Sequence, residues 1–499
     1  MTPSQEGSRS QDHCLIDLLG LVPAEINECY RQEEGHFTRK RKFPFAWVIT
    51  FVLSITTSGK RKSVDSKSSE FFKNARRSGL WPKAKAVDRS AVTKARKKVK
   101  WQVFEEIFYK AVKLAYEVWP DSCDYKWKGM SVYGVDGSKY SLPATPELRQ
   151  EFDPTSGLEN AGKGHYPQCL VTTIYDVLRR LPIARSVVGY GNCERKQAQE
   201  LIPKVPAGNL LIFDRGYPGF KVFEFLNKNY DGYYIFRSTA SSTFPAVEEF
   251  IKSHKAEDII YLEPTKSRRS KRKLNSQSLR QASIRLRVIR LESPDGKLSV
   301  ILTNLMDKKK FSREEIIKLY FRRWEIESFY RDEKIFLGVD TFHSRNSNGI
   351  RQELFAAMIM NVIAKILMVT SCHSKENDSS TKPENISDKP KDISEETTKE
   401  TTVLIPVKSK CMKASLPKKT RPEPQFKHAV MLLALEAAIL TPANPGIAAK
   451  IFKSLLKEIR RVKYYRPKKP RMSAIRITRK SINKWADKGA MKRRATHVS

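Results

Sequence analysis

The sequence predicts an α/β protein in which helical regions flank a core of alternating strands and helices. From about Gly129, short apolar runs bounded by turn residues alternate with helical patterns, which is typical of an α/β core. The strand-like runs cover residues 131–135, 169–175, 183–188, 209–213 and 233–236. Before and after this core the apolar spacing is mainly helical. Hydrophobic residues make up 40% of the 499 residues, which is enough to bury such a core.

The first 128 residues predict a helical N-terminal region. Helices are expected over residues 46–55 and 69–77, and a third is expected to be capped by Ser90 and to run to residue 115. Basic residues fill the exposed faces predicted for these helices, as at Lys94, Arg96, Lys97 and Lys98. Each is compatible with a solvated surface, but the density of the clusters favours contact with nucleic acid.

Two carboxylates follow strands of the predicted core, which extends over residues 129–370. The strand 131–135 is predicted to end in a turn at Asp136-Gly137, and the strand 209–213 ends in Asp214-Arg215-Gly216. Carboxylates at strand ends can converge on one edge of a sheet and share metal ions. Alternatively, each is a turn residue that satisfies its own backbone.

The second half of the core predicts a β-rich insertion over residues 238–310, followed by a long helix over residues 312–336. The insertion contains a strongly basic loop at residues 266–273. A helix at 351–368 precedes a low-complexity linker at 371–425, which predicts disorder. The C-terminal region, 426–499, begins with a helix at 426–440. Its tail, 451–499, holds 17 Lys or Arg against Glu458 and Asp487, a net charge of 17 − 2 = +15.

The net charge of the whole chain limits the kinds of molecule that the protein is expected to bind. Lysine and arginine total 93 and the acidic residues 54, so the net charge is 93 − 54 = +39, a poor match for a metabolic enzyme and typical of a protein that binds a polyanion. A membrane span is not expected, because the longest strongly apolar stretch, 43–57, is shorter than the ~20 residues that cross a bilayer. None of the seven cysteines forms a C-x-x-C pair, so we expect reduced thiols without zinc or disulfides.

One stripe of the long helix combines cations, tyrosines and a carboxylate. At 100° per residue, its members lie within an arc of about 80° along ~21 Å of helix. They are Tyr320, Arg323, Glu327, Tyr330 and Lys334. The alternative is an ion-paired helix face, since Arg323 and Glu327 are an i,i+4 pair. Tyr330 is expected to pack and Arg331 to be surface charge.

The spacing Tyr320-x2-Arg323-x3-Glu327-x6-Lys334 resembles the signature of bacterial DDE transposases of the insertion-sequence 4 type. The segment 132–138, which ends in Asp-Gly-Ser, resembles the family's first catalytic aspartate, and 210–217 resembles the second. The β-rich insertion lies between Asp214 and Glu327, which is where members of this group carry an insertion. The resemblance covers residues 39–370 and resumes at Phe426; the linker is left unexplained.

The resemblance implies an RNase H-like catalytic core in which Asp136, Asp214 and Glu327 are catalytic and hold two Mg²⁺ ions, with Mn²⁺ possible. Asp136 would bridge both ions. The enzyme would hydrolyse a phosphodiester at each element end and use the freed 3′-hydroxyl to attack target DNA.

The resemblance also implies how DNA is held. Arg323 and Lys334 would contact phosphate, and Tyr320 would contact a phosphate or a displaced base. Arg215 would contact DNA or pair with a neighbouring carboxylate. The partners would be the terminal inverted repeats and target DNA, bound by the helical N-terminal region of a homodimer joined through its C-terminal helices, at the nucleoid in the cytoplasm.

Three alternatives remain open from the residues. A non-transposing nuclease or resolvase would share the carboxylates, but the helix stripe and the insertion favour the transposase. A purely DNA-binding protein would not place three carboxylates near phosphate, because they would repel it. The intact acidic trio argues against an inactive copy.

Overall fold

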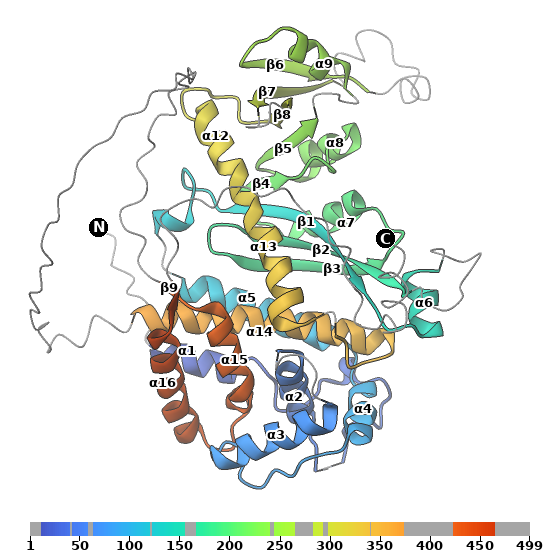
Figure 1. The fold of residues 1–499 in the computed structure, drawn as a ribbon, viewed down its shortest axis with the longest axis vertical. Helices are drawn as coiled ribbons and strands as arrows, with labels where there is room; N and C mark the ends of the chain where they lie inside the picture. Colours follow the sequence, from blue (N-terminus) through green and yellow to red (C-terminus); the bar gives the residue numbers. More distant parts are fainter. Residues whose placement is uncertain are drawn as a thin grey trace, which may run out of the picture.

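The computed structural model describes residues 11–39, 42–57, 63–119, 122–154, 166–239, 244–264, 283–292, 298–339, 341–373 and 423–464. Over these residues the chain is a mixed α/β protein, in which a large twisted sheet stands on a layer of helices (Figure 1). The predicted α/β class is therefore confirmed. The basic loop 266–273, the linker between 374 and 422 and the tail beyond Tyr464 lie outside the described residues.

The central sheet contains eight described strands in the order β3-β2-β1-β4-β5-β8-β7-β6. β1, β2 and β3 pair antiparallel, β4 and β5 run parallel to β1, and β5, β8, β7 and β6 pair antiparallel. The strands are β1 Val132–Ser141, β2 Gln168–Asp176, β3 Leu181–Gly189, β4 Leu210–Phe213, β5 Tyr233–Thr239, β6 Glu257–Leu262, β7 Ile284–Glu292 and β8 Leu298–Thr303. The strands of the predicted insertion thus extend the central sheet beyond β5.

Strand β1 does not end where the sequence predicted. The expected turn at Asp136-Gly137 is wrong, because antiparallel pairing with β2 holds β1 extended as far as Ser141. Parallel pairing with β4 does end there, at the pair Val135 and Phe213. The residue that follows each of these two is an aspartate, so Asp136 and Asp214 lie side by side just beyond the end of the parallel β1–β4 pairing.

The two faces of β1 are covered by different helices. A Cβ at Gly137 would lie 2.7 Å from the carboxyl carbon of Glu194, in α7 (Glu194–Leu201). A Cβ at Gly134 would instead meet Ile326, in α13 (Trp324–Asp332), at 3.7 Å. Because strand side chains alternate between faces, Asp136 shares the α13 face with position 134.

The single helix predicted over 312–336 is a rod of four parts. Ser312 caps α12 (Arg313–Tyr320) with a capping box, a 3₁₀ turn η5 (Phe321–Arg323) leads into α13, and a π-helical turn η6 (Glu333–Leu337) ends at Gly338, whose φ is +67°. Figure 1 shows this rod crossing the sheet from the β8 end towards α14. The prediction of one regular helix was wrong, because the two irregular turns change its phase around Arg323 and beyond Asp332.

The helix expected from Ser90 to residue 115 is two helices. Asp88, not Ser90, caps α4 (Arg89–Lys97), and α5 (Gln102–Val118) follows. Between them Val99 forms a β-bridge with Arg31, with Gln32 N–H donating to the Lys98 carbonyl and Lys100 N–H to the Tyr30 carbonyl. This pairing requires extended backbone and interrupts the helix.

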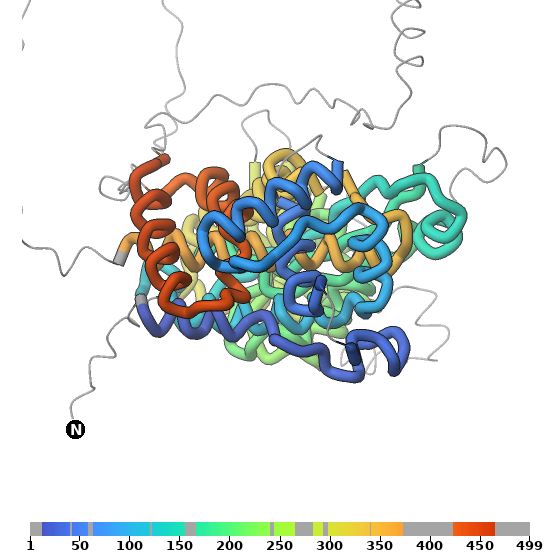
Figure 2. The backbone as a smooth tube through the Cα atoms, turned by 90° about the horizontal axis from the view of Figure 1, so that it is seen from below, coloured from blue at the N-terminus to red at the C-terminus, as the bar shows by residue number. Residues whose placement is uncertain are grey.

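Helices from both ends of the chain form one layer below the sheet, as Figure 2 shows from below. Trp81 Nε1 donates to the Thr441 carbonyl at 2.7 Å, and Ser54 Oγ to the Ala434 carbonyl at 2.9 Å. The remaining helices are α1 Gln11–Leu19, α2 Phe45–Thr57, α3 Val64–Arg77, α6 Pro146–Phe152, α8 Phe220–Asn229, α9 Pro245–Lys252, α14 Ser347–His373, α15 Phe426–Leu435 and α16 Pro445–Arg461.

Helix α14 runs through this layer beneath the sheet. Among the described helices, it alone is long and apolar enough to cross a membrane by length and composition, and 83% of its apolar window is buried inside the protein. The assumption that residues 43–57 are the longest apolar stretch was therefore wrong. The burial of α14 against α2, α5 and α15 is that of a core helix.

Candidate active site

The ends of β1 and β4 and the helix α13 bring the three predicted acidic residues together. Asp136 and Asp214 come from the strand pair described above, and Glu327 comes from α13, which packs on the same face of β1. Their side chains are partly accessible, at 19%, 32% and 26% of full exposure. The cluster is therefore shielded from bulk water but open to a ligand.

The guanidinium of Arg323 lies between these carboxylates. Its Nη2 donates to Glu327 Oε1 at 2.7 Å and lies 3.7 Å from Asp214 Oδ1, while its Nη1 lies 3.9 Å from Asp136 Oδ2. The arginine is 3% exposed, and η5 positions it one helical turn before Glu327. The predicted Arg323–Glu327 pair thus exists, but the same cation also faces both strand aspartates.

The site carries more negative than positive charge. Three carboxylates surround one guanidinium, so with all groups ionised the cluster has a net charge of about −2. The pKa of Asp136 is raised to about 7: burial is the largest cause and the charges of Asp214 and Glu327 add to it, while Arg323 and the Gly137 N–H act in the opposite direction. Burial disfavours the charge of Arg323 as well, but the surrounding acidic groups outweigh it and raise its pKa.

The donor set suits a hard divalent cation, because all three side chains offer carboxylate oxygens. In the present arrangement, no three His, Cys, Asp or Glu side chains of the described residues are grouped closely enough to hold a metal ion. Arg323 occupies the position between the carboxylates that a cation would take. Asp136, Asp214 and Glu327 are the side chains that would hold such a cation.

The remaining predicted residues lie around this cluster at different depths. The Tyr320 hydroxyl is buried and donates to Asp214 Oδ1 at 3.4 Å; burial raises its pKa to about 12. Lys334 Nζ donates to Ser138 Oγ at 2.7 Å and to the Lys139 carbonyl at 2.8 Å, which joins η6 to β1. Arg215 is exposed beside Asp214 and forms no ion pair with any described residue. Tyr330 is buried, as expected, and its hydroxyl donates to the Asp136 carbonyl at 2.8 Å.

Sequence reasoning missed a buried ion pair that supports the site. Arg185 of β3 and Glu333 of η6 are both fully buried and pair at 2.8 Å. Arg185 also donates to the Leu354 carbonyl of α14 at 3.2 Å, and Tyr140 of β1 donates to Glu333. The pair fastens the rod that carries Glu327 to both the sheet and α14. No sequence signal links residues so far apart in the chain.

Two further residues beside the acidic strand ends were not predicted. Glu194, at the start of α7, lies against Gly137 on the opposite face of β1 from Asp136. Tyr217, in the segment that follows Asp214, is buried, and its hydroxyl has no hydrogen-bond partner among the described residues. Burial raises the pKa of Tyr217, and the charges of Asp136 and Glu194 add to the effect.

Comparisons with known proteins indicate the family to which this chain is similar. Residues 127–363 match the family described as Transposase DDE domain, a range that includes all three carboxylates and the whole helix stripe. The chain is also 22% identical over 355 residues to the transposase InsG for insertion sequence element IS4 of Escherichia coli, covering 70% of this chain and 75% of that protein. The structure of the piggyBac transposase synaptic complex with hairpin DNA is similar with a TM-score of 0.39 at 11% identity, covering 74% of this chain and 75% of that one.

The matched domain defines the class, a transposase whose catalytic domain is of the DDE type. Within that class, the similarity to InsG supports the insertion-sequence 4 type. The chain is therefore an enzyme that acts on DNA, as the net charge and the acidic cluster both indicated.

Proposed function

We propose that this transposase cleaves DNA at the ends of its element and joins them to target DNA, using Asp136, Asp214 and Glu327 to hold two Mg²⁺ ions. The observation that carries the proposal is the convergence of these carboxylates, from two strands and a helix, around one buried cation. Bound there, two divalent ions would activate the attacking oxygen and stabilise the leaving oxygen at phosphorus.

The topology supports an RNase H-like core over residues 129–370. Three antiparallel strands, β3, β2 and β1, continue into the parallel strands β4 and β5, and the first two acidic residues come from the adjacent strands β1 and β4. Helices cover both faces of this part of the sheet. In this proposal the site lies at the edge of the sheet where the parallel strands end.

The residues around the carboxylates have separable roles in this proposal. Tyr320 donates a hydrogen bond that orients Asp214, and Arg323 keeps the three carboxylates together in the absence of DNA. Arg215 is exposed and so is placed to contact a DNA phosphate. The ammonium group of Lys334 donates to Ser138, which lies on β1 two residues after Asp136. To contact a DNA phosphate, Lys334 would have to give up this hydrogen bond.

We further propose that two copies of the chain act together on the two ends of the element. Helix α15 exposes Met431 and Leu435, at 53% and 42%, one helical turn apart. Exposed apolar residues on one face support a role of the C-terminal helices in dimerisation. The N-terminal helices would bind the element ends.

The test uses a DNA duplex that ends in the inverted repeats flanking the gene, together with a target plasmid and Mg²⁺. Asp214→Ala is expected to abolish cleavage and leave binding of the end largely intact, whereas the control Asp231→Ala, at an exposed turn near β5, should cleave normally. Cleaved ends joined to the plasmid would distinguish the transposase from a simple nuclease. Full cleavage by Asp214→Ala would refute the assignment.

A further inference from the structure

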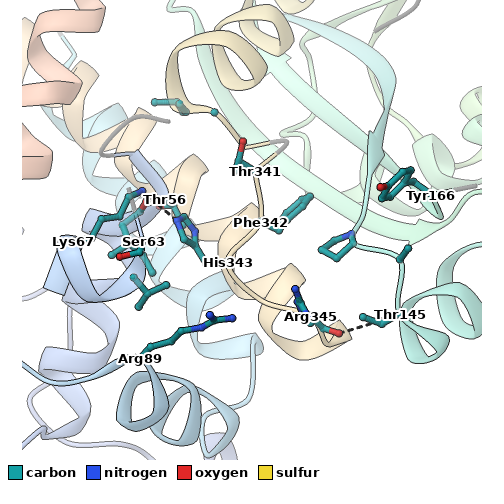
Figure 3. A pocket seen from close by; sticks show the side chains of 16 residues that line it. Thr56, Ser63, Lys67, Arg89, Thr145, Tyr166, Thr341, Phe342, His343 and Arg345 are labelled. Atoms are coloured by element: carbon teal, nitrogen blue, oxygen red, sulfur yellow. Dashed lines mark hydrogen bonds between the residues drawn. The ribbon is translucent and has the colours of Figure 1, made fainter. Parts of the chain in front are cut away.

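A cavity of about 460 Å³ lies between the N-terminal helices and the catalytic core, away from the acidic cluster. One wall comes from the end of α2, the start of α3 and Arg89 of α4. The other comes from Pro143, Ala144 and Thr145, after β1, and from the last residue of η6 and the segment that follows it, at Leu337, Gly338, Thr341, Phe342, His343 and Arg345. Figure 3 shows Lys67, Ser63 and Arg89 on one side, Thr145 and Arg345 on the other, and Phe342 between them. The volume is within the ~300–1,000 Å³ of sites that bind small organic groups.

The cavity is lined by basic groups. Lys67, Arg89, His343 and Arg345 line it, and no described Asp or Glu does. Arg89 and Arg345 are exposed and come from opposite walls, so both guanidinium groups can reach a ligand in the cavity. The N-terminus of the 14-residue helix α3 also opens here, at Ser63 and Val64; the Ser63 hydroxyl caps it by accepting from Ser66 N–H, and the positive end of the helix dipole favours an anion.

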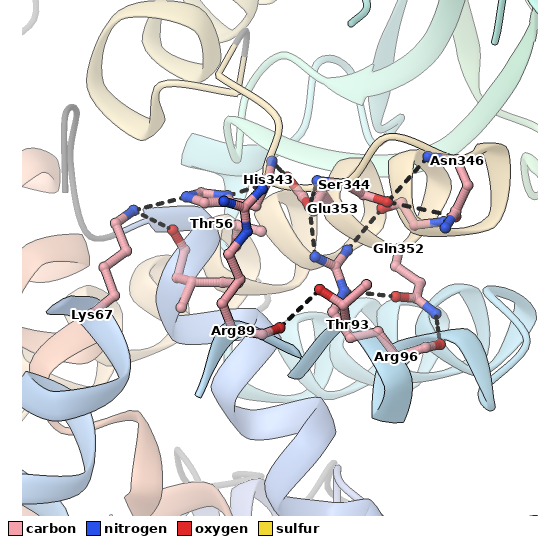
Figure 4. Close-up of polar contacts among 12 residues, drawn as sticks. Thr56, Lys67, Arg89, Thr93, Arg96, His343, Ser344, Asn346, Gln352 and Glu353 are labelled. Carbon is pink, nitrogen blue, oxygen red and sulfur yellow. Dashed lines mark hydrogen bonds and ion pairs between the residues drawn. The ribbon is translucent and has the colours of Figure 1, made fainter. Parts of the chain in front are cut away.

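A buried polar chain holds the two walls together (Figure 4). Lys67 Nζ lies 3.2 Å from His343 Nε2, and His343 Nδ1 lies 3.3 Å from Glu353 Oε2. Glu353 in turn pairs with Arg96 at 2.8 Å. Burial alone would raise the pKa of Glu353, but Arg96 and His343 hold it at about 2. The carboxylate of Glu353 thus pairs with Arg96 and His343, and Glu353 does not line the cavity.

Apolar side chains such as Pro143, Leu337 and Phe342 form much of the remaining lining, together with the hydroxyl side chains Thr56, Ser63, Thr145, Tyr166 and Thr341. A ligand that matches both parts carries an anionic group beside a less polar body. A nucleotide, with a phosphate next to a sugar and base, has this composition.

We propose that the cavity binds one nucleotide of the DNA strand on which the enzyme acts, with its phosphate between Arg89 and Arg345. The inference rests on the proposed function, because it takes DNA as the substrate. Leu337 lies ten residues after Glu327, about 15 Å along a helix, and Pro143 lies seven residues after Asp136, about 23 Å along a strand. At 3.4 Å per nucleotide, the bound phosphate is about four to seven nucleotides from the reacting one.

The experiment measures binding of a 40-bp duplex carrying the terminal inverted repeat, in EDTA and over a range of salt concentrations. Arg89→Ala and Arg345→Ala are each expected to weaken binding several-fold and to reduce the slope of log K against log salt by about 0.9, the value for one phosphate contact. Both side chains are exposed, so the variants should keep the wild-type melting temperature. The control is Lys228→Ala, an exposed cation at the end of α8 that does not line the cavity, which should change neither quantity.

A second arm locates the phosphate. A methylphosphonate four to seven nucleotides from the cleaved bond should weaken binding by the wild type but not by the Arg89→Ala/Arg345→Ala double variant. Wild-type binding by the double variant, or an equal loss in Lys228→Ala, would overturn the proposal. So would displacement of the duplex by a millimolar deoxynucleoside monophosphate, which would indicate a free-nucleotide site.

The two proposals fail in different ways. If the cavity variants bind DNA normally while Asp214→Ala abolishes cleavage, the cavity assignment is wrong and the proposed function stands. If the cavity variants lose affinity for DNA while Asp214→Ala still cleaves, the cavity assignment stands and the proposed function is wrong.

Discussion

Removing the carboxylate of Glu333 should destabilise the protein far more than removing a partly exposed carboxylate of the same rod. Glu333→Ala leaves the guanidinium of Arg185 fully buried with hydrogen bonds only to neutral groups, the Thr173 hydroxyl and the Leu354 carbonyl. Breaking a buried pair by removing one partner costs about 3–5 kcal/mol, because the remaining charge is uncompensated. At about 2–4 °C per kcal/mol for a large domain, the melting temperature should fall by roughly 6–20 °C.

The assay is thermal unfolding of the metal-free protein, followed by circular dichroism. Glu325→Ala is the matched control, because Glu325 lies on α13 and pairs with Arg180 at 3.2 Å where both side chains are about a quarter exposed. Such a pair contributes about 1 kcal/mol or less, so this variant should melt within a few degrees of the wild type.

A double substitution separates the pair from packing. Arg185→Met with Glu333→Met removes both charges and keeps most of the volume, so it should lose less stability than the two single variants together. Strictly additive losses, or a Glu333→Ala variant as stable as Glu325→Ala, would refute the reasoning. Because the pair positions the rod that carries Glu327, the single variant should also lose cleavage at temperatures where it is still folded.

Three further predictions concern the site and the linker. The pKa of Asp136 is raised by burial to about 7, so the stability that its protonation gives is complete below about pH 4 and is lost as the pH rises to 7. In EDTA, the free energy of unfolding of Asp136→Asn minus that of the wild type should therefore grow by about 1.4 kcal/mol per pH unit in that window and then level off. A difference in the free energy of unfolding that does not depend on pH would contradict this prediction. Lys334→Ala should weaken strand transfer or the complex with the element end at an unchanged melting temperature, whereas unchanged activity would leave Lys334 as a link to Ser138. Replacing residues 374–422 by a short Gly-Ser linker should preserve the circular dichroism spectrum and DNA binding, and misfolding would show that the segment is not a linker.

The acidic residues of the site could be predicted because local patterns place them. Asp136 and Asp214 each follow an apolar run of the kind that forms a buried strand, and parallel strands bring their ends to one edge of a sheet. Glu327 was found through its spacing to Tyr320, Arg323 and Lys334, a pattern that survives the irregular turns because the four lie on one continuous rod.

Contacts between distant segments could not be predicted. Arg96 belongs to a basic cluster and was expected on an exposed face, yet it is 6% exposed and pairs with Glu353 of α14. That expectation was wrong, since a basic residue on a surface and one paired in the interior have the same local pattern. The partner of Arg185 is likewise 148 residues away in the chain.

Arg323 favours the ionised state of the acidic cluster. Its charge lowers the pKa of Asp136 more than any other neighbouring group, against the burial that raises it. Arg323 therefore favours the ionised form of the carboxylates, although its own positive charge would repel a second cation bound next to it. Without Arg323, the three carboxylates would repel one another across a few ångströms, and Asp136 would hold its proton to still higher pH. Its burial and its contacts with all three carboxylates make the arginine an integral part of the cluster.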